Sequence, residues 1–291
     1  MPARLRRRAR LLPVVPAVLL LLVFLAGPVL WAFHASFTNA ALTGRNARSP
    51  GWVGLDNYAR LFTDPVLPLS LGLTVLFVAG SAILGQNVLG LTIAVLMKHS
   101  RKPVAAVVGT AVVAAWVLPE IVAAFAAYAY FSRDGTLNQL LGGLGIGQPD
   151  WLYSFPMLAI MMANVWRGTA FSMLVYRAAL DDVPPDVTEA ALMDGANGWQ
   201  RLAFITLPMI RGSIATNLML ITLQTLAVFT LVWVMTAGGP SNSSTTLPVL
   251  AYVEAFKFGD IGYGTAVASV LILIGAVFGA AYVRLLREGK P

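Results

Sequence analysis

The sequence contains no cysteine, and only two of its 291 residues are histidines, His34 and His99. Without cysteine the chain cannot form disulfides, thiolate metal sites or a cysteine nucleophile. Two histidines that lie far apart in sequence make a histidine-rich metal site or proton relay unexpected. We therefore predict no metal site.

Charge is scarce as well. Charged residues make up 11% of the chain, against about a quarter in soluble domains. Hydrophobic residues make up 58%, and the mean hydropathy is +0.75. The net charge of +7 comes from basic residues at the ends of apolar runs, a placement that orients membrane spans and does not predict a nucleic-acid partner. The composition predicts an integral membrane protein.

Catalytic signatures are also missing. The sequence has no Gly-x4-Gly-Lys-Ser/Thr loop, its only Gly-Lys pair being Gly289-Lys290. It has no His-Glu-x-x-His and no Gly-x-Ser-x-Gly. We therefore expect no enzyme activity, no catalytic residue and no cofactor bound by this chain, so that any energy from ATP has to come through another subunit.

Six apolar runs are long enough to cross a bilayer, which takes about 20 residues of helix. They cover residues 11–33, 69–97, 104–131, 152–176, 213–236 and 265–283. No repeat or linker divides the chain. The sequence thus predicts an all-α polytopic protein with six transmembrane helices, in which one transmembrane domain at 11–291 follows a basic segment at 1–10.

The basic start and first apolar run could also be a secretory signal peptide, with small residues at 32–35 for cleavage. The run exceeds the usual signal core of about 7–15 residues, which favours an uncleaved span. Orientation then follows from Lys and Arg, which accumulate in cytoplasmic loops. Fourteen of them lie on the side of both predicted termini, at positions 4, 6, 7, 8, 10, 98, 101, 102, 177, 201, 211, 284, 287 and 290. Five lie on the other side, at 45, 48, 60, 133 and 257, so we expect both termini in the cytoplasm.

A polar segment at 181–211 separates the fourth and fifth runs, on the side predicted to be cytoplasmic. Pro184 and Pro185 end the preceding helix, and Asp186 lies three residues before Glu189, the spacing of a capping box. Gly195 stands where a helix often ends in the left-handed conformation. Asn197-Gly198 predicts a second turn, and 199–206 a second short helix. A helical hairpin outside the bilayer is expected. As an ordinary loop it would do no more than connect two spans.

The full pattern of this segment favours a specific role. Glu189-Ala190-Ala191, three residues, Gly195, nine residues and Ile205-x-Leu207-Pro208 closely resemble the EAA motif of permease subunits in binding-protein-dependent ABC importers. Further fragments are similar to the sugar-type, MalF-like members of that family: Gly54 to Tyr58, Leu61-Phe62, Asp64-Pro65, Asp194 to Ala196, Trp199 to Arg201, Gly238 to Pro240, Ala255-Phe256 and Gly262 to Gly264. The resemblance covers most of the chain after residue 50.

The resemblance implies a type I ABC importer permease of the MetI/MalF-like fold in the cytoplasmic (inner) membrane of a prokaryote, with six spans in place of the eight of MalF. It implies pairing with a second, homologous permease, two copies of an ABC ATPase that uses ATP and Mg, and an extracytoplasmic solute-binding protein, all within membrane lipid. The residues implied to dock the ATPase are Glu189, Ala190, Ala191, Asp194, Gly195, Ile205, Leu207 and Pro208. The implied activity is alternating-access import of a carbohydrate. A polyol or glycerol phosphate, or a secondary transporter, is the alternative.

Polar residues inside the spans are candidates for the translocation pathway, because burying them in a membrane is costly. The candidates are Glu120, Asn164, Trp166, Arg167, Trp116 and Gln224. Equally, Glu120 and Arg167 could pair with each other, bind the second permease or extend toward an interface. Gln86, Asn87 and Asn217 are expected to form interhelical hydrogen bonds.

Overall fold

The structure, a computed structural model, describes residues 15–288. The predicted basic segment at 1–10 and the first residues of the first span lie outside this range. The described residues form helices and no β-strand. Two isolated β-bridges pair Thr38 with Trp52 and Ala41 with Asp260. The predicted all-α class is confirmed. The chain divides into two compact units: unit 1 is Met1–Asp64 with Leu250–Val270, and unit 2 is Pro65–Val249 with Leu271–Pro291.

Unit 1 begins with one continuous apolar helix, Val15–Ala35. It consists of α2 (Val15–Leu21), η2 (Leu22–Ala26) and α3 (Gly27–Ala35). The wider π turn of η2 directly precedes Pro28, which has no amide hydrogen to donate to the ladder. Two short helices follow, α4 (Arg45–Arg48) and α5 (Asp56–Thr63), and the unit is completed by η6 (Val253–Lys257) and the first residues of α19 (Ile261–Glu288).

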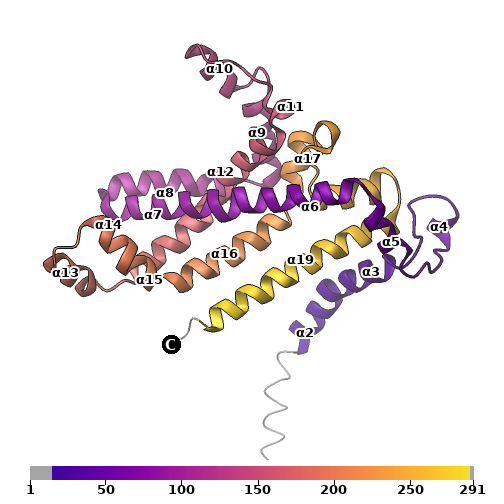
Figure 1. The fold of residues 1–291 in the computed structure, drawn as a ribbon, viewed down its shortest axis with the longest axis horizontal. Coiled ribbons are helices and arrows are strands. Elements are labelled where there is room, and N and C mark those ends of the chain that lie inside the picture. Colours follow the sequence, from indigo (N-terminus) through magenta and orange to yellow (C-terminus); the bar gives the residue numbers. More distant parts are fainter. Residues whose placement is uncertain (1–14, 289–291) are drawn as a thin grey trace, which may run out of the picture. The chain divides into compact units, whose positions relative to one another are not determined.

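Two long helices organise unit 2. α6 (Val66–Phe77), η3 (Val78–Gln86) and α7 (Asn87–His99) form one span, Val66–His99. It packs along α12 (Pro156–Asp181), where a Cβ on Gly90 would lie 2.5 Å from Ser172 Cβ and 2.9 Å from Met173 N. α8 (Lys102–Val117) lies beside both helices (Figure 1). Glycine is required at this crossing because small residues let helix backbones approach closely.

The remaining helices of unit 2 are short or bent. They are α9 (Glu120–Phe131), α10 (Thr136–Gly143), α11 (Trp151–Ser154), α13 (Pro185–Met193), α14 (Gly198–Arg201), η4 (Leu202–Thr206), α15 (Leu207–Met209), α16 (Arg211–Leu226), α17 (Thr230–Thr236) and η5 (Pro240–Asn242). α18 (Leu247–Tyr252) continues from unit 2 into unit 1.

The third predicted span is not one helix. α8 ends at Val117, and the chain turns by 105° into the helices that start at Glu120. Pro119 is the cause, because proline disfavours the helical conformation of the residue before it. Leu118 accordingly has the extended ψ of 135°.

The fifth predicted span, 213–236, is also divided. α16 ends at Leu226, where the amides of Ala227 and Val228 bond back only three residues, and α17 starts at Thr230. The hairpin helices before α16 meet it at 71°, around Ile210. Four described helices are therefore long and apolar enough to cross a membrane as continuous spans, and six if each bent pair counts as one.

Candidate functional site

The segment 181–211 forms the predicted helical hairpin of α13, α14, η4 and α15, beyond the ends of α7 and α12 within unit 2 (Figure 1). α13 starts at Pro185, and its N-cap is Pro184, which makes no side-chain cap bond. The predicted capping box of Asp186 and Glu189 is therefore wrong. Pro185, whose ring already fixes a helical φ, begins the helix ahead of Asp186 and places that carboxylate in the first turn.

The C-terminus of α13 has the predicted glycine turn. Gly195 has φ +82° and donates its amide hydrogen to Leu192 O, while Ala196 N donates to Ala191 O. These two bonds form a Schellman motif, which needs a residue in the left-handed conformation. The second half of the hairpin starts with the true capping box. Gln200 N donates to Asn197 Oδ1 at 2.9 Å, and Asn197 N donates to Gln200 Oε1 at 2.8 Å.

The exposed surface of the hairpin is apolar as well as charged. Met193 is 87% exposed, Phe204 75% and Trp199 72%. Of the predicted docking residues, Glu189, Ala190, Asp194, Gly195 and Pro208 are exposed, and Ile205 and Leu207 are half-buried. Ala191 is buried, so it supports the helix from the inside and does not belong to the exposed face. The exposed Met193 and Phe204 were not among the residues singled out from the sequence.

The hairpin is attached to the helix bundle by buried side chains at both of its ends. Val183 and Ile210 belong to one core cluster with Met97 of α7 and with Tyr176 and Leu180 of α12. The hairpin also adjoins the helix bundle around a cavity of about 470 Å³. Residues of both hairpin halves, Lys98 and His99 of α7, and Leu180 of α12 line this cavity. A displacement of the hairpin must therefore act directly on α7 and α12, because packed cores transmit strain.

The candidate pathway residues do not form one constellation. Asn164 is buried and forms hydrogen bonds to a neighbouring helix. Its side-chain Nδ2 donates to Ser81 Oγ at 2.8 Å, and its backbone carbonyl accepts from Gln86 Nε2 at 3.2 Å. Trp166 lines a cavity of about 520 Å³ with Tyr130, Phe131 and Met162.

Trp116 lies beside Phe171, with ring centroids 6.2 Å apart, and Gln224 is exposed. Glu120 and Arg167 make no ion pair with each other in the described part of the chain. Arg167 Nε is buried without a hydrogen-bond partner among the described residues.

The predicted interhelical amides are confirmed in the core of unit 2. Asn217 Nδ2 donates to Asn87 Oδ1 at 3.0 Å and to Ser172 Oγ at 3.0 Å, and lies 3.2 Å from the Tyr176 hydroxyl. Tyr176 also donates to Asn87 Oδ1. This network joins α7, α12 and α16 through buried groups. Ser172 and Tyr176 were not expected, because single hydroxyls give no periodic signal.

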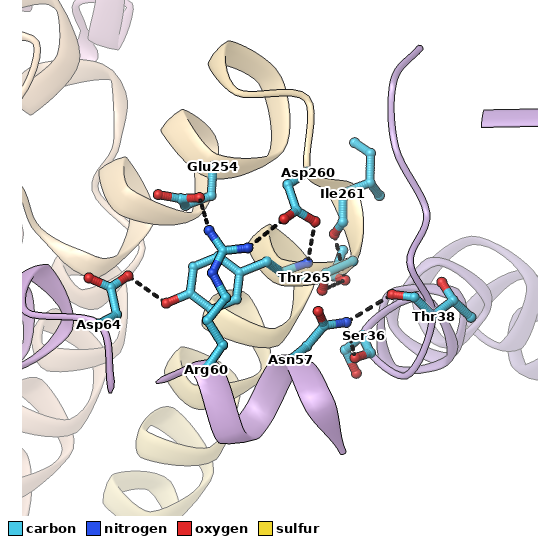
Figure 2. Close-up of polar contacts among 11 residues, drawn as sticks. Ser36, Thr38, Asn57, Arg60, Asp64, Glu254, Asp260, Ile261 and Thr265 are labelled. Atoms are coloured by element: carbon cyan, nitrogen blue, oxygen red, sulfur yellow. Dashed lines mark hydrogen bonds and ion pairs between the residues drawn. The ribbon is translucent and has the colours of Figure 1, made fainter. Parts of the chain in front are cut away.

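Unit 1 contains a second polar cluster, around Arg60 of α5 (Figure 2). Arg60 Nη1 lies 2.6 Å from Asp260 Oδ2, and Nη2 lies 3.4 Å from Glu254 Oε2. The Tyr263 hydroxyl donates to Asp64 Oδ2 at 2.5 Å. Burial raises the pKa of Glu254, which the positive charge of Arg60 only partly offsets. No local pattern predicts this cluster, because Arg60 and Asp260 are 200 residues apart in the sequence.

Comparison with known proteins agrees with these features. Residues 86–288 match the family described as "Binding-protein-dependent transport system inner membrane component". The chain is 31% identical to the trehalose/maltose transport system permease protein MalF of Thermococcus litoralis, over 97% of this chain and 95% of that protein. It is 30% identical to the sulfoquinovosyl glycerol transport system permease protein SmoG of Agrobacterium fabrum, over 94% of this chain and 88% of that protein.

The fold is likewise shared with solved transporters. A chain of a bacterial alginate ABC transporter, in complex with an alginate-bound periplasmic protein, superposes with a TM-score of 0.79 at 19% identity and covers 97% of this chain and 95% of that one. A chain of the MetNI methionine ABC transporter gives a TM-score of 0.56 at 17% identity, over 78% of this chain and 97% of that one. The family match and the polytopic helical fold lead to one conclusion. This chain belongs to the binding-protein-dependent transport system inner membrane components and is a multi-pass permease subunit of the inner membrane.

Proposed function

We propose that this permease imports a carbohydrate by alternating access and that the 181–211 hairpin is its dock for a separate ABC ATPase. The observation that carries the proposal is the hairpin itself, which exposes Met193 and Phe204 and is joined to α7 and α12 by buried Val183 and Ile210. Exposed large apolar side chains next to polar ones are typical of a protein interface.

In this mechanism the hairpin lies in the cytoplasm, where Lys and Arg concentrate, together with both termini. ATP and Mg bind to two ATPase copies, whose closure would move this hairpin and that of a second, homologous permease. Because Val183 and Ile210 share a core with Met97 and Tyr176, the motion would reach α7 and α12 without an intermediate flexible link. An extracytoplasmic binding protein would deliver the solute.

The carbohydrate assignment is supported by the relatives at about the 30% identity level, whose names refer to trehalose, maltose and sulfoquinovosyl glycerol. Within the structure, Trp166 next to the cavity of about 520 Å³ offers an aromatic face of the kind on which a sugar ring packs. Uptake of labelled trehalose and maltose into proteoliposomes that contain the complete transporter and its binding protein tests the substrate class. Uptake of only sorbitol or glycerol 3-phosphate would show that the substrate is a polyol or a phosphate ester.

Met193→Asp tests the dock, with Leu144→Asp as its matched control. Met193 and Leu144 are similar in size, and both are at least 75% exposed in unit 2. Leu144, however, follows α10 and lies outside the hairpin. A hot-spot residue of an interface contributes about 2 kcal/mol or more, and a buried, unpaired charge adds to the loss, so we expect Met193→Asp to lose ATPase copurification and ATP-dependent uptake. Leu144→Asp keeps both. Equal ATPase retention in the two variants would contradict the proposed dock.

Gly195 offers a second test, which concerns the glycine turn at the end of α13. Nothing lies within 4 Å of a Cβ built on Gly195, so the only cost of a side chain there is the positive φ of 82°. Asparagine tolerates this conformation and a β-branched residue does not. Gly195→Asn should therefore retain uptake, whereas Gly195→Val should reduce it at equal amounts of protein in the membrane.

A further inference from the structure

A cavity of unit 2 lies apart from the exposed residues of the hairpin and from Trp166, although Lys98 and Leu180 line both it and the cavity of about 470 Å³ next to the hairpin. It has a volume of about 1230 Å³ and lies between α7, α8 and α12. This volume exceeds the about 300–1,000 Å³ of typical small-molecule sites. Its lining contains no aromatic ring and no side-chain amide, the groups that recognise sugar rings and hydroxyls. A role in carbohydrate binding is therefore unsupported.

The charges around the cavity are concentrated where the three helices end or begin. Lys98 belongs to the last turn of α7, Lys102 is the first residue of α8, and Arg177 and Asp181 lie near the end of α12. Three cations and one carboxylate leave a positive excess. Lys98 Nζ donates to Leu180 O, which holds it at the cavity. Within the described residues, the guanidinium of Arg177 has no ion pair, and Asp181 has none either.

The rest of the lining is mostly apolar and includes several small side chains. Ala94, Ala105, Gly109 and Val113 line the cavity between the cations and the break of α8 at Leu118 and Pro119. Gly109 leaves space in the cavity next to Arg177, because a Cβ at this position would lie 3.0 Å from Met97 Cε and 3.8 Å from Arg177 Nη1. Cations at one end and an apolar wall beyond them match an amphiphile with an anionic head.

From this charge and shape complementarity we infer that the cavity binds an anionic phospholipid. The phosphate contacts Arg177, Lys102 and Lys98, and an acyl chain lies along Ala94, Gly109 and Val113. A guanidinium at the end of a membrane helix is stabilised by an anion that it can bind through two hydrogen bonds. Basic pockets between transmembrane helices are known to bind anionic lipid headgroups. The inference is independent of the transported solute and of the ATPase dock.

Native mass spectrometry and thermal unfolding of the full chain in detergent test this site. The probes are dioleoyl phosphatidylglycerol, dioleoyl phosphatidylcholine and inorganic phosphate. We expect phosphatidylglycerol to remain bound and to raise the unfolding temperature, and phosphatidylcholine and inorganic phosphate to do neither. Arg177→Gln should weaken phosphatidylglycerol binding about tenfold, which corresponds to about 1.4 kcal/mol. Gly109→Leu fills the apolar part of the cavity without changing any charge, and it should also weaken phosphatidylglycerol binding.

Arg101→Gln is the matched control. Arg101 precedes Lys102 and is exposed, but it does not line the cavity, so its removal lowers the local charge equally and should leave binding unchanged. Equal lipid retention by the unsubstituted chain, Arg177→Gln and Gly109→Leu would overturn the inference. So would equal weakening by Arg101→Gln, which indicates a general surface effect, or the same stabilisation by inorganic phosphate, which indicates a free anion.

Discussion

The guanidinium carbon of Arg60 lies 3.8 Å from the centroid of the Tyr263 ring. One residue comes from the short helix α5 and the other from the first turn of α19. The same guanidinium bonds to Asp260 and Glu254, while the Tyr263 hydroxyl bonds to Asp64. Within unit 1, Arg60 thus joins α5 to α19 and η6 through one ring face and two carboxylates.

Arg60→Ala should lower the stability of unit 1. Its loss removes a cation–π contact and leaves the mostly buried carboxylate of Glu254 without its cation, for which we expect about 1–3 kcal/mol. Thermal unfolding in nanodiscs measures the effect. Arg48→Ala is the control, because Arg48 is an exposed cation of α4 whose side chain forms no ion pair within the described residues. Equal unfolding temperatures for the two variants would contradict a structural role of Arg60.

Glu254 should make stability depend on pH in a defined direction. Because burial raises its pKa, the folded state holds this proton more tightly than the unfolded state does. The contribution of Glu254 to stability is then fully present below its unfolded pKa and is lost as the pH rises through the raised folded pKa.

Glu254→Gln cannot ionise, so this part of the pH dependence should disappear, and at about pH 8 the variant should be at least as stable as the unsubstituted protein. Unfolding temperatures between about pH 4 and about pH 8 measure it. Glu189→Gln on the exposed hairpin serves as control and should keep the unsubstituted profile. A lower stability of Glu254→Gln at the upper end of the range would show that its attraction to Arg60 outweighs its burial.

Asn217→Ala should loosen the packing of α7, α12 and α16. The substitution removes the donor shared by Asn87, Ser172 and Tyr176, and interhelical hydrogen bonds in membranes contribute about 0.6–2 kcal/mol. Gln224→Ala is the matched control, one heptad further along α16 and exposed. Unfolding temperatures in detergent compare them. A larger loss for Gln224→Ala would place the stabilising contact elsewhere on α16.

Gly90→Ala and Gly72→Ala should have opposite effects, although both glycines lie in the span Val66–His99. A Cβ at Gly90 meets Ser172 and the backbone of Met173, whereas nothing lies within 4 Å of one at Gly72. Overpacking costs about 1–3 kcal/mol, and an unhindered Gly to Ala change in a helix gains about 0.5–1 kcal/mol. Thermal unfolding decides the sign for each, and a stabilising Gly90→Ala would disprove the close crossing of α7 and α12.

Local features of the hairpin were predictable because neighbouring residues determine them. Gly195 has the left-handed backbone expected of a helix C-terminus, and Asn197 begins the second helical segment. The start of α13 was less predictable, since two signals competed and the fixed φ of Pro185 took precedence over a side-chain cap at Asp186. Ala191 is buried because of the way the hairpin packs, and no local sequence pattern predicts that packing.

The sequence by itself determined the membrane class, the six apolar runs, the hairpin and the family, because composition and short-range spacing act along the chain. Only the tertiary structure decided where the third and fifth runs bend, and which polar groups meet. Arg60 and Tyr263, or Asn87 and Asn217, come together through helix packing across more than a hundred residues. Likewise, the basic cavity forms where small residues of α7 and α8 lie opposite Met173, Leu174 and Arg177 of α12, a relationship that no single stretch of sequence contains.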